Sequence, residues 1–300
     1  MGPLLCGWML AGVLSANAQD APAEKAVAQP ASQRWAVILV GIPGDDEHEP
    51  LFRQTADAWQ KWLTTTLSFD SEHVLRLPAG PADKGAAAGL TADEMRATFA
   101  DLAKKLREED SLWVFTLGHG NYDGKHAWFH VAGRDPSNED VARWLSEIRC
   151  REQVLWLTHA SSGWFVKPLA RPGRVVIAAT AADDESNETE FPAALTTVMA
   201  RSASQLDADG DGHVSVAELF SAVTAEVVRR FQSDKRLPSE HAQIDDNGDG
   251  RGAEELAAKK DTGQNATTGD SPQPSQVKAD GELARQTVVP FRPVIKPEAK

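Results

Sequence analysis

Short apolar runs alternate with segments of helical periodicity over the first two thirds of the chain, and this alternation constrains the fold most. The run at residues 35–40 is continuously apolar and is followed by Gly41, as in a strand buried on both faces of a parallel sheet. Similar runs lie at residues 73–77, 111–117, 154–157 and 175–179, separated by helical patterns at 52–63, 91–106 and 136–148. Residues 35–200 are therefore predicted to form an α/β domain with a mostly parallel sheet and helices on both faces.

The two ends of the chain differ in composition from this domain. Residues 1–18 are uncharged and apolar and end in Ala16-Asn17-Ala18, a pattern typical of a signal peptide and too short to span a hydrocarbon core of about 30 Å. A periplasmic or secreted protein without stable membrane insertion after signal removal is expected. Residues 19–34 resemble a flexible leader, and residues 257–300 are predicted to be a mostly disordered tail in which the apolar patch at 288–291 can dock.

The charge balance excludes one class of partner. The chain has 31 Lys and Arg against 44 Asp and Glu, a formal net charge of -13. This charge repels phosphate backbones, so no nucleic-acid partner is expected.

Two glycine-containing loops follow neighbouring predicted strands. The carboxyl ends of parallel strands meet at one edge of a sheet, so Gly118-His119-Gly120 and residues 158–163 are expected to lie side by side. Glycine beside a histidine permits a tight turn and frees the Gly120 N–H to face a ligand as an oxyanion donor does. The alternative is a plain turn with a solvated histidine.

Over residues 35–200 the chain resembles the caspase and legumain family of cysteine peptidases. These proteins have one strand that ends in His-Gly and a later strand that ends in a short Cys-x-Ser-Gly segment. His119 and Gly120 match the first motif, and Ser162-Gly163 matches the end of the second. The position of the nucleophilic cysteine then falls on Ala160, while Thr158 and His159 replace the acidic or polar residue and the alanine before it.

The resemblance implies a pseudo-peptidase, because alanine has no lone pair with which to attack a carbonyl. What remains is a crevice for a peptide or protein ligand, with substrate-binding residues expected at Ser161, Ser162, Gly163 and Asp183. The acidic loop that begins at Asp183 is predicted to select basic side chains or to be solvated. Two alternatives stay open: an active hydrolase using His119 with Ser161 or another nucleophile, and a structural or surface-interaction protein with a vestigial crevice.

A single cysteine remains if the signal peptide is removed. Cys150 precedes the fourth predicted strand, whereas the family motif follows it. The flanking Arg149 and Arg151 are expected to lower the pKa of its thiol. A surface cysteine at a helix end is nevertheless more often inert than catalytic.

The helical region at residues 201–256 contains a twelve-residue calcium-loop pattern of the EF-hand type. Carboxylates occupy positions one, three and five, Gly212 makes the turn at position six, and the remaining ligands are a carbonyl at position seven, a hydroxyl or water at nine and a bidentate carboxylate at twelve. The predicted calcium ligands are Asp207, Asp209, Asp211, His213, Ser215 and Glu218. The helix that follows carries an apolar stripe, so calcium is expected to stabilise its attachment to the α/β core.

A second acidic run begins at Asp245 and repeats the first half of this pattern. Its twelfth residue is Leu256, which offers no carboxylate. Glu254 or Glu255 can substitute in an irregular loop, and the alternative is a turn stabilised by Asp and Asn side chains.

Overall fold

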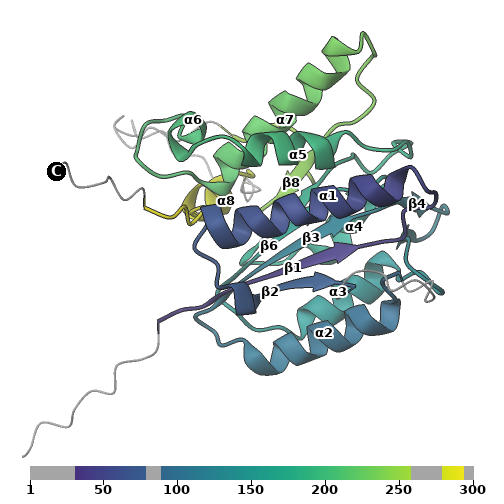
Figure 1. Cartoon of the computed structure of the whole chain (residues 1–300), viewed down its shortest axis with the longest axis horizontal. Helices are drawn as coiled ribbons and strands as arrows, with labels where there is room; N and C mark the ends of the chain where they lie inside the picture. The colour runs from purple at the N-terminus through teal and green to yellow at the C-terminus, as the bar shows by residue number, and fades with distance from the viewer. Residues whose placement is uncertain (1–30, 79–88, 258–278, 294–300) are drawn as a thin grey trace, which may run out of the picture. The chain divides into compact units, whose positions relative to one another are not determined.

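The computed structural model describes residues 31–78, 89–257 and 279–293, and the five apolar runs within them form neighbouring strands of one sheet (Figure 1). The sheet has six strands in the order β2-β1-β3-β6-β7-β8. The first five pair in parallel, and β8 pairs antiparallel with β7. The strands are β1 (Arg34–Val40), β2 (Val74–Leu77), β3 (Ser111–Leu117), β6 (Glu152–Leu157), β7 (Arg174–Ala178) and β8 (Gln243–Asp245). The predicted mostly parallel α/β fold is confirmed.

Helices cover both faces of the sheet. One face packs against α1 (His48–Lys61), α5 (Phe191–Met199) and α7 (Val216–Ser233), and the other against α2 (Ala92–Lys105), α3 (Asn138–Ser146) and α4 (Gly163–Leu169). Successive strand residues point to opposite faces, so Ala36 and Ile38 of β1 enter the first core and Val37 and Leu39 the second. Burial on both faces explains why the central strands are continuously apolar.

Capping residues define where three helices begin. Thr91 and Glu94 form the predicted capping box before α2, and their reciprocal hydrogen bonds are present. Ser137 with Asp140 caps α3 in the same way. Ser215 with Glu218 caps α7, and this box lies inside the calcium-loop pattern.

The structure also contains several short elements. They are the hairpin strands β4 (Gly120–Tyr122) and β5 (Ala127–Phe129), together with α4, α6 (Ala203–Leu206), β8 and α8 (Glu282–Gln286). Strands of three residues and helices of four to seven are too short to show periodicity. Their positions depend on tertiary contacts.

The C-terminal apolar patch docks onto the domain. Val289 is buried and its N–H donates to the Val214 carbonyl at 2.7 Å, and Phe291 forms an isolated bridge with Leu67. The described residues from Ser32 onward form one compact unit, which includes the described parts of both predicted regions, 35–200 and 201–256. The predicted signal peptide and most of the leader lie outside the described residues. Within the described ranges, the helices are too short or too polar to cross a membrane.

Candidate functional site

The loops after β3 and β6 lie against each other at the carboxyl edge of the sheet. A Cβ atom built on Gly120 would lie 2.7 Å from Nδ1 of His159 and 2.8 Å from the carbonyl oxygen of Ala160. These distances are too short for any side chain, so the close approach of the two loops requires glycine at position 120. The spatial proximity expected from the sheet topology is present.

His119 stands beside this contact with its ring half-buried. Its Nε2 lies 2.9 Å from the Pro43 carbonyl oxygen in the loop after β1. The ring packs against Phe52 and edge-on against His48, with centroids 5.3 Å apart in both cases. The loop after β1 and the first turns of α1 therefore orient the imidazole.

Gly120 starts the hairpin strand β4. The His130 N–H donates to the His119 carbonyl, and the Asp123 N–H donates to the His126 carbonyl. Hydrogen-bonded and non-hydrogen-bonded residue pairs alternate along an antiparallel ladder, so Gly120 and Phe129 form a non-hydrogen-bonded pair. The Gly120 N–H therefore points away from β5. This orientation suits an oxyanion or carbonyl ligand.

Ala160 occupies the predicted nucleophile position and is almost fully buried. Ser161 follows in the left-handed region with φ of 57° and is 2 % exposed. Its N–H donates to the Glu185 carbonyl at 3.1 Å, and its own carbonyl accepts from the Trp164 N–H. No hydrogen bond joins Ser161 to His119 among the described residues. Ser161 is therefore a turn residue rather than the partner of an activating base.

Ser162 and Gly163 connect this loop to the end of β7. The Ser162 hydroxyl accepts from the Ala179 N–H at 3.0 Å and from the Thr180 N–H at 3.3 Å, and the Gly163 N–H donates to Thr180 Oγ1 at 3.1 Å. These contacts tie the loop after β6 to the segment after β7. That Ser162 and Gly163 bind substrate stays a prediction.

The two residues before Ala160 are also structural. Thr158 donates its hydroxyl to the Thr116 carbonyl at 2.6 Å. His159 is fully buried between Phe129 and Phe165, with centroids 5.0 Å away on both sides. Burial lowers the pKa of His159 to about 4, so its imidazole is neutral at physiological pH.

His48 is a site residue that sequence reasoning missed. Its Nδ1 lies 2.7 Å from Asp45 Oδ1, and its Nε2 lies 3.0 Å from Glu188 Oε1. These hydrogen bonds, first that with Asp45 and then that with Glu188, raise the pKa of His48. No motif marks it, because Asp45 is a local partner while Glu188 lies in a loop 140 residues further along the chain.

The acidic loop after β7 contacts the loop after β6 through the hydrogen bond from Ser161 to Glu185. Asp183 accepts a hydrogen bond from the Trp164 indole N–H through its carbonyl at 3.3 Å, and its carboxylate accepts from the Glu185 N–H at 3.2 Å. The exposed carboxylate is thus engaged in a local turn. Whether it contacts a ligand stays a prediction.

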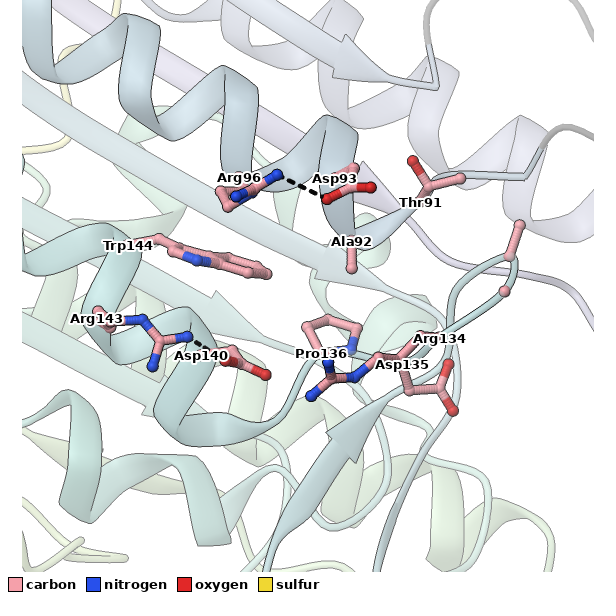
Figure 2. A pocket seen from close by; sticks show the side chains of 12 residues that line it. Thr91, Ala92, Asp93, Arg96, Arg134, Asp135, Pro136, Asp140, Arg143 and Trp144 are labelled. Carbon is pink, nitrogen blue, oxygen red and sulfur yellow. Dashed lines mark hydrogen bonds and ion pairs between the residues drawn. The ribbon is translucent and has the colours of Figure 1, made fainter.

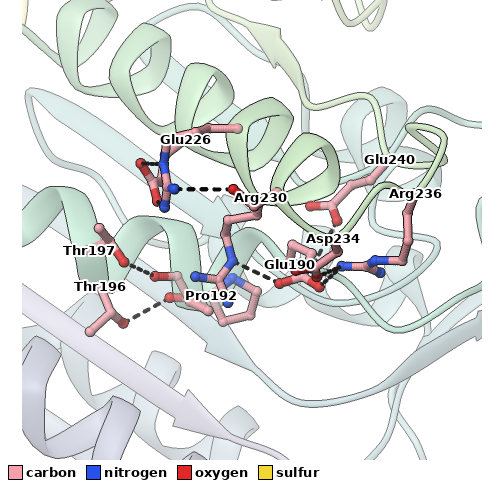
Figure 3. A network of polar contacts seen from close by, with 12 residues as sticks. Glu190, Pro192, Thr196, Thr197, Glu226, Arg230, Asp234, Arg236 and Glu240 are labelled. Atoms are coloured by element: carbon pink, nitrogen blue, oxygen red, sulfur yellow. Dashed lines mark hydrogen bonds and ion pairs between the residues drawn. The ribbon is translucent and has the colours of Figure 1, made fainter.

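A buried carboxyl group lies behind this loop (Figure 3). Glu240 Oε2 accepts from the Glu190 N–H at 2.7 Å at the start of α5, and Glu190 itself pairs with Arg230 and Arg236. The Glu240 side chain is 6 % exposed, and its Oε1 has no hydrogen-bond partner in the described part of the chain. Burial, followed by the Glu190 charge, raises the pKa of Glu240 from 4.5 to about 8.

The buried Glu240 carboxyl group should make the free energy of unfolding decrease as the pH rises from 4.5 to about 8. In the unfolded chain Glu240 loses its proton near pH 4.5, whereas in the folded protein it keeps the proton until about pH 8, so folding takes up a proton between these values. Glu240→Gln should remove the effect and stabilise the protein at pH 8 by on the order of a few kcal/mol relative to wild type, with no such gain at pH 4. Urea unfolding of both proteins at the two pH values measures this difference. An equal difference at both pH values would contradict it.

Cys150 lies at the opposite edge of the sheet. It precedes β6, whereas Ala160 follows this strand, and the six residues of β6 span about 20 Å. The Sγ donates to the Glu152 carbonyl at 3.3 Å, and burial raises the pKa of the thiol. The expectation that Arg149 and Arg151 lower this pKa is wrong, because burial is the largest cause and the positive charges that oppose it are those of Arg171 and Arg174.

The calcium-loop pattern forms a loop with converging carboxylates. Asp207, Asp209 and Asp211 each offer an oxygen within 4.8 Å of the others. Glu218 reaches back across the loop, and its Oε1 accepts from the Ala208 N–H at 2.8 Å and the Asp209 N–H at 3.3 Å. Three hard carboxylate oxygens at this spacing, with a fourth carboxylate beside them, fit a calcium ion.

Ser215 and His213 complete the loop. The Ser215 hydroxyl donates to Glu218 Oε2 at 2.8 Å and accepts from the Glu218 N–H, so its side chain serves as the cap of α7. The His213 N–H donates to Asp211 Oδ1 at 2.9 Å. Position nine is therefore better supplied by a water than by the Ser215 hydroxyl.

The second acidic run folds like the first. Gly248 and Gly250 donate their N–H groups to the Asp245 carboxylate, both at 2.7 Å, as Gly210 and Gly212 do to Asp207. The place of Glu218 is taken by Asp280. Its Oδ1 accepts from the Asp246 N–H at 3.0 Å and the Asn247 N–H at 3.3 Å, the second and third residues of the run. The sequence suggested Glu254 or Glu255 as the substitute for the missing carboxylate, and Asp280 was not considered.

A cavity of about 520 Å³ lies away from the crevice, between the start of α2 and α3 (Figure 2). Trp144 lies between Arg96 and Arg143 there. Arg96 pairs with Asp93 at 2.9 Å, and Arg143 pairs with Asp140. The lining includes none of the predicted site residues, and two of its three arginines are already neutralised.

Comparisons with known proteins find similarity in structure alone. No family model matches the chain, and no curated protein matches it. Among solved structures, it is similar to the Drosophila initiator caspase Dronc at 12% identity and a TM-score of 0.45, over 73% of this chain and 81% of that chain. It is also similar to the Geobacter sulfurreducens protein GSU0716 at 11% identity and a TM-score of 0.39, over 71% and 92%. Similarities this low do not assign the chain to a family.

Proposed function

We propose that this chain is an exported pseudo-peptidase of the caspase and legumain type, which binds a peptide segment without cleaving it. One observation carries the proposal: Gly120, which follows His119 in the chain, lies against a loop whose residue at the nucleophile position is Ala160. In the family that the chain resembles a thiolate at this position attacks the substrate carbonyl, whereas a methyl group cannot form an acyl intermediate. The arrangement retains binding groups and lacks the reacting atom.

The remaining groups suit a peptide carbonyl. The Gly120 N–H is free of the hairpin ladder and can donate to a carbonyl oxygen. His119 is oriented by Pro43 and flanked by Phe52, which gives the crevice an apolar wall next to a polar ring. Directed donors beside an apolar surface are typical of a site that binds a ligand in one orientation.

The absence of a nucleophile predicts no measurable peptidase activity. Wild-type protein incubated with a peptide library should give no cleavage products in mass spectrometry and no labelling by thiol-directed or serine-directed probes at the crevice. Turnover should be roughly six orders of magnitude below that of an active peptidase. Cleavage that disappears in the matched variant His119→Ala would overturn the proposal.

We also propose that residues 207–218 bind calcium in a structural role. The N–H of Val216 donates to the Thr287 carbonyl at 2.9 Å, and Val214 accepts from Val289, so the C-terminal segment pairs with the end of the loop. Helix α7 buries Leu219, Val223 and Val227 in the core directly after the loop. An ion in the loop would thus hold together α7, the C-terminal segment and the sheet. Export would place the protein where calcium is abundant.

A further inference from the structure

The segment after β7 is rich in carboxylates, and we refer to its residues 183–188 as the flap. The acidic side chains of the flap are Asp183, Asp184, Glu185 and Glu188. Within the described residues, no lysine or arginine side chain forms an ion pair with any of these four carboxylates. Two histidines supply the ion-pair partners, His241 for Glu185 and His48 for Glu188. The flap therefore depends on side chains that lose their charge near neutral pH.

Glu185 is the main attachment of the flap. Its side chain is 9 % exposed, and its carboxylate accepts from the Ala181 N–H at 2.7 Å, from the His241 N–H at 3.0 Å and from His241 Nδ1. Its carbonyl accepts from the Ser161 N–H at 3.1 Å, in the loop after β6. A carboxylate this buried is costly without a positive partner, so loss of the His241 charge weakens the attachment.

The second attachment joins the flap to the start of α1. His48 Nε2 lies 3.0 Å from Glu188 Oε1, and Nδ1 of the same ring lies 2.7 Å from Asp45 Oδ1. The His119 ring, 5.3 Å away and edge-on, is the third titratable group that faces His48. Because the Glu188 carboxylate is exposed, this pair is weaker than the pair made by Glu185.

Neighbouring carboxylates raise the pKa of both histidines above the usual 6.5. The hydrogen bond with Glu185 is the largest cause for His241, and the charges of Glu254 and Asp183 add to it. The pKa of His48 is raised first by the bond with the carboxylate at position 45. Both ion pairs are therefore fully formed below pH 6.5 and are lost as the pH rises through the raised values.

The residues that follow the flap are fixed by other contacts. The Thr189 hydroxyl donates to the Thr158 carbonyl at 2.6 Å, and Glu190 pairs with Arg230 and Arg236 (Figure 3). These contacts do not depend on a histidine. Glu240 lies behind them and becomes negative only near pH 8, which adds to the repulsion of the flap carboxylates in the same direction of pH.

We propose that the flap is a pH-sensitive device, fastened to the loop after β6 while His241 and His48 are charged and released when both are neutral. Release leaves four carboxylates close together without a positive partner, and their repulsion favours the open form. It also removes a contact that supports the turn at Ser161, whose φ is 57°. The proposal goes beyond the peptide-binding function and does not rest on it.

Hydrogen exchange of the full chain, followed by mass spectrometry at pH 5 and pH 8, tests the proposal. Labelling times are scaled for the pH dependence of intrinsic exchange. Peptides that cover the flap should exchange about tenfold faster at pH 8, while peptides from β3 stay protected over the same times. The double variant His48→Gln with His241→Gln should show the faster exchange at both pH values. The matched variant His126→Gln, which removes a histidine–carboxylate pair with Glu139 on the hairpin, should respond as wild type does.

Four outcomes overturn the proposal. They are equal protection of the flap at the two pH values, a loss of protection in β3 as large as that in the flap, a pH response that persists in the double histidine variant, and a response that disappears in Glu240→Gln. The second outcome indicates unfolding of the whole domain, and the last assigns the response to Glu240. A failure to bind any peptide at the crevice would contradict the proposed function and leave this test unchanged.

Discussion

Gly163→Ala should destabilise the protein by about 3 kcal/mol, although alanine favours a helix more than glycine does. A Cβ atom at this position would lie 2.3 Å from the Ala181 carbonyl carbon and 2.5 Å from the Ala182 nitrogen. These atoms are backbone, so no side-chain rotation relieves the contact. The loop after β7 must shift or α4 must move away from it.

Chemical unfolding in urea measures this loss, and Gly124→Ala is the matched control. Gly124 has φ of 91° and nothing within 4 Å of a built Cβ atom, so the substitution there adds backbone strain of about 1 kcal/mol without a clash. A Gly163→Ala protein no less stable than Gly124→Ala would show that the two loops are not as tightly packed as described. The expected result would mean that the motif glycine is retained for packing even where the nucleophile is absent.

Calcium should raise the unfolding temperature by about 5–10 °C. An ion that binds the folded loop, at a hundred times its dissociation constant, stabilises by about 2.7 kcal/mol, and each kcal/mol moves the midpoint of a domain this size by roughly 2–4 °C. Thermal unfolding with excess calcium and with a chelator measures the shift. An unfolding temperature that is independent of calcium would contradict the proposed site.

Glu218→Gln separates the ligand role of this residue from its role at the start of α7. Glutamine can still complete the capping box with Ser215, but its NH2 group cannot accept from the Ala208 and Asp209 N–H groups, so a loss of about 1 kcal/mol is expected in chelator. The bidentate carboxylate is lost, and the calcium-induced shift should shrink or vanish. Glu108→Gln, an exposed change with no such contacts, should respond to calcium as wild type does. A full calcium response in Glu218→Gln would exclude Glu218 as a ligand.

The neighbourhood of the two crevice loops could be predicted because it depends on strand order. Parallel strands align their carboxyl ends, so residues after β3 and β6 meet whatever their side chains are. Roles within those loops were harder to predict. Ser162 and Gly163 were predicted to bind a ligand, and no local pattern reveals that they also contact residues 179–182 after β7.

The linear sequence determined the parallel sheet, its two-sided cover of helices and the first acidic loop, because each depends on spacing within a short window. Tertiary structure alone decided the contacts that join distant segments. It brought Asp280 to the loop at Asp245, His48 to the His119 ring, and Tyr122 against Trp164. The physical reason is that periodicity encodes which face of an element is buried, whereas a hydrogen bond or charge pair between separate loops depends on three-dimensional distances that no periodic pattern records.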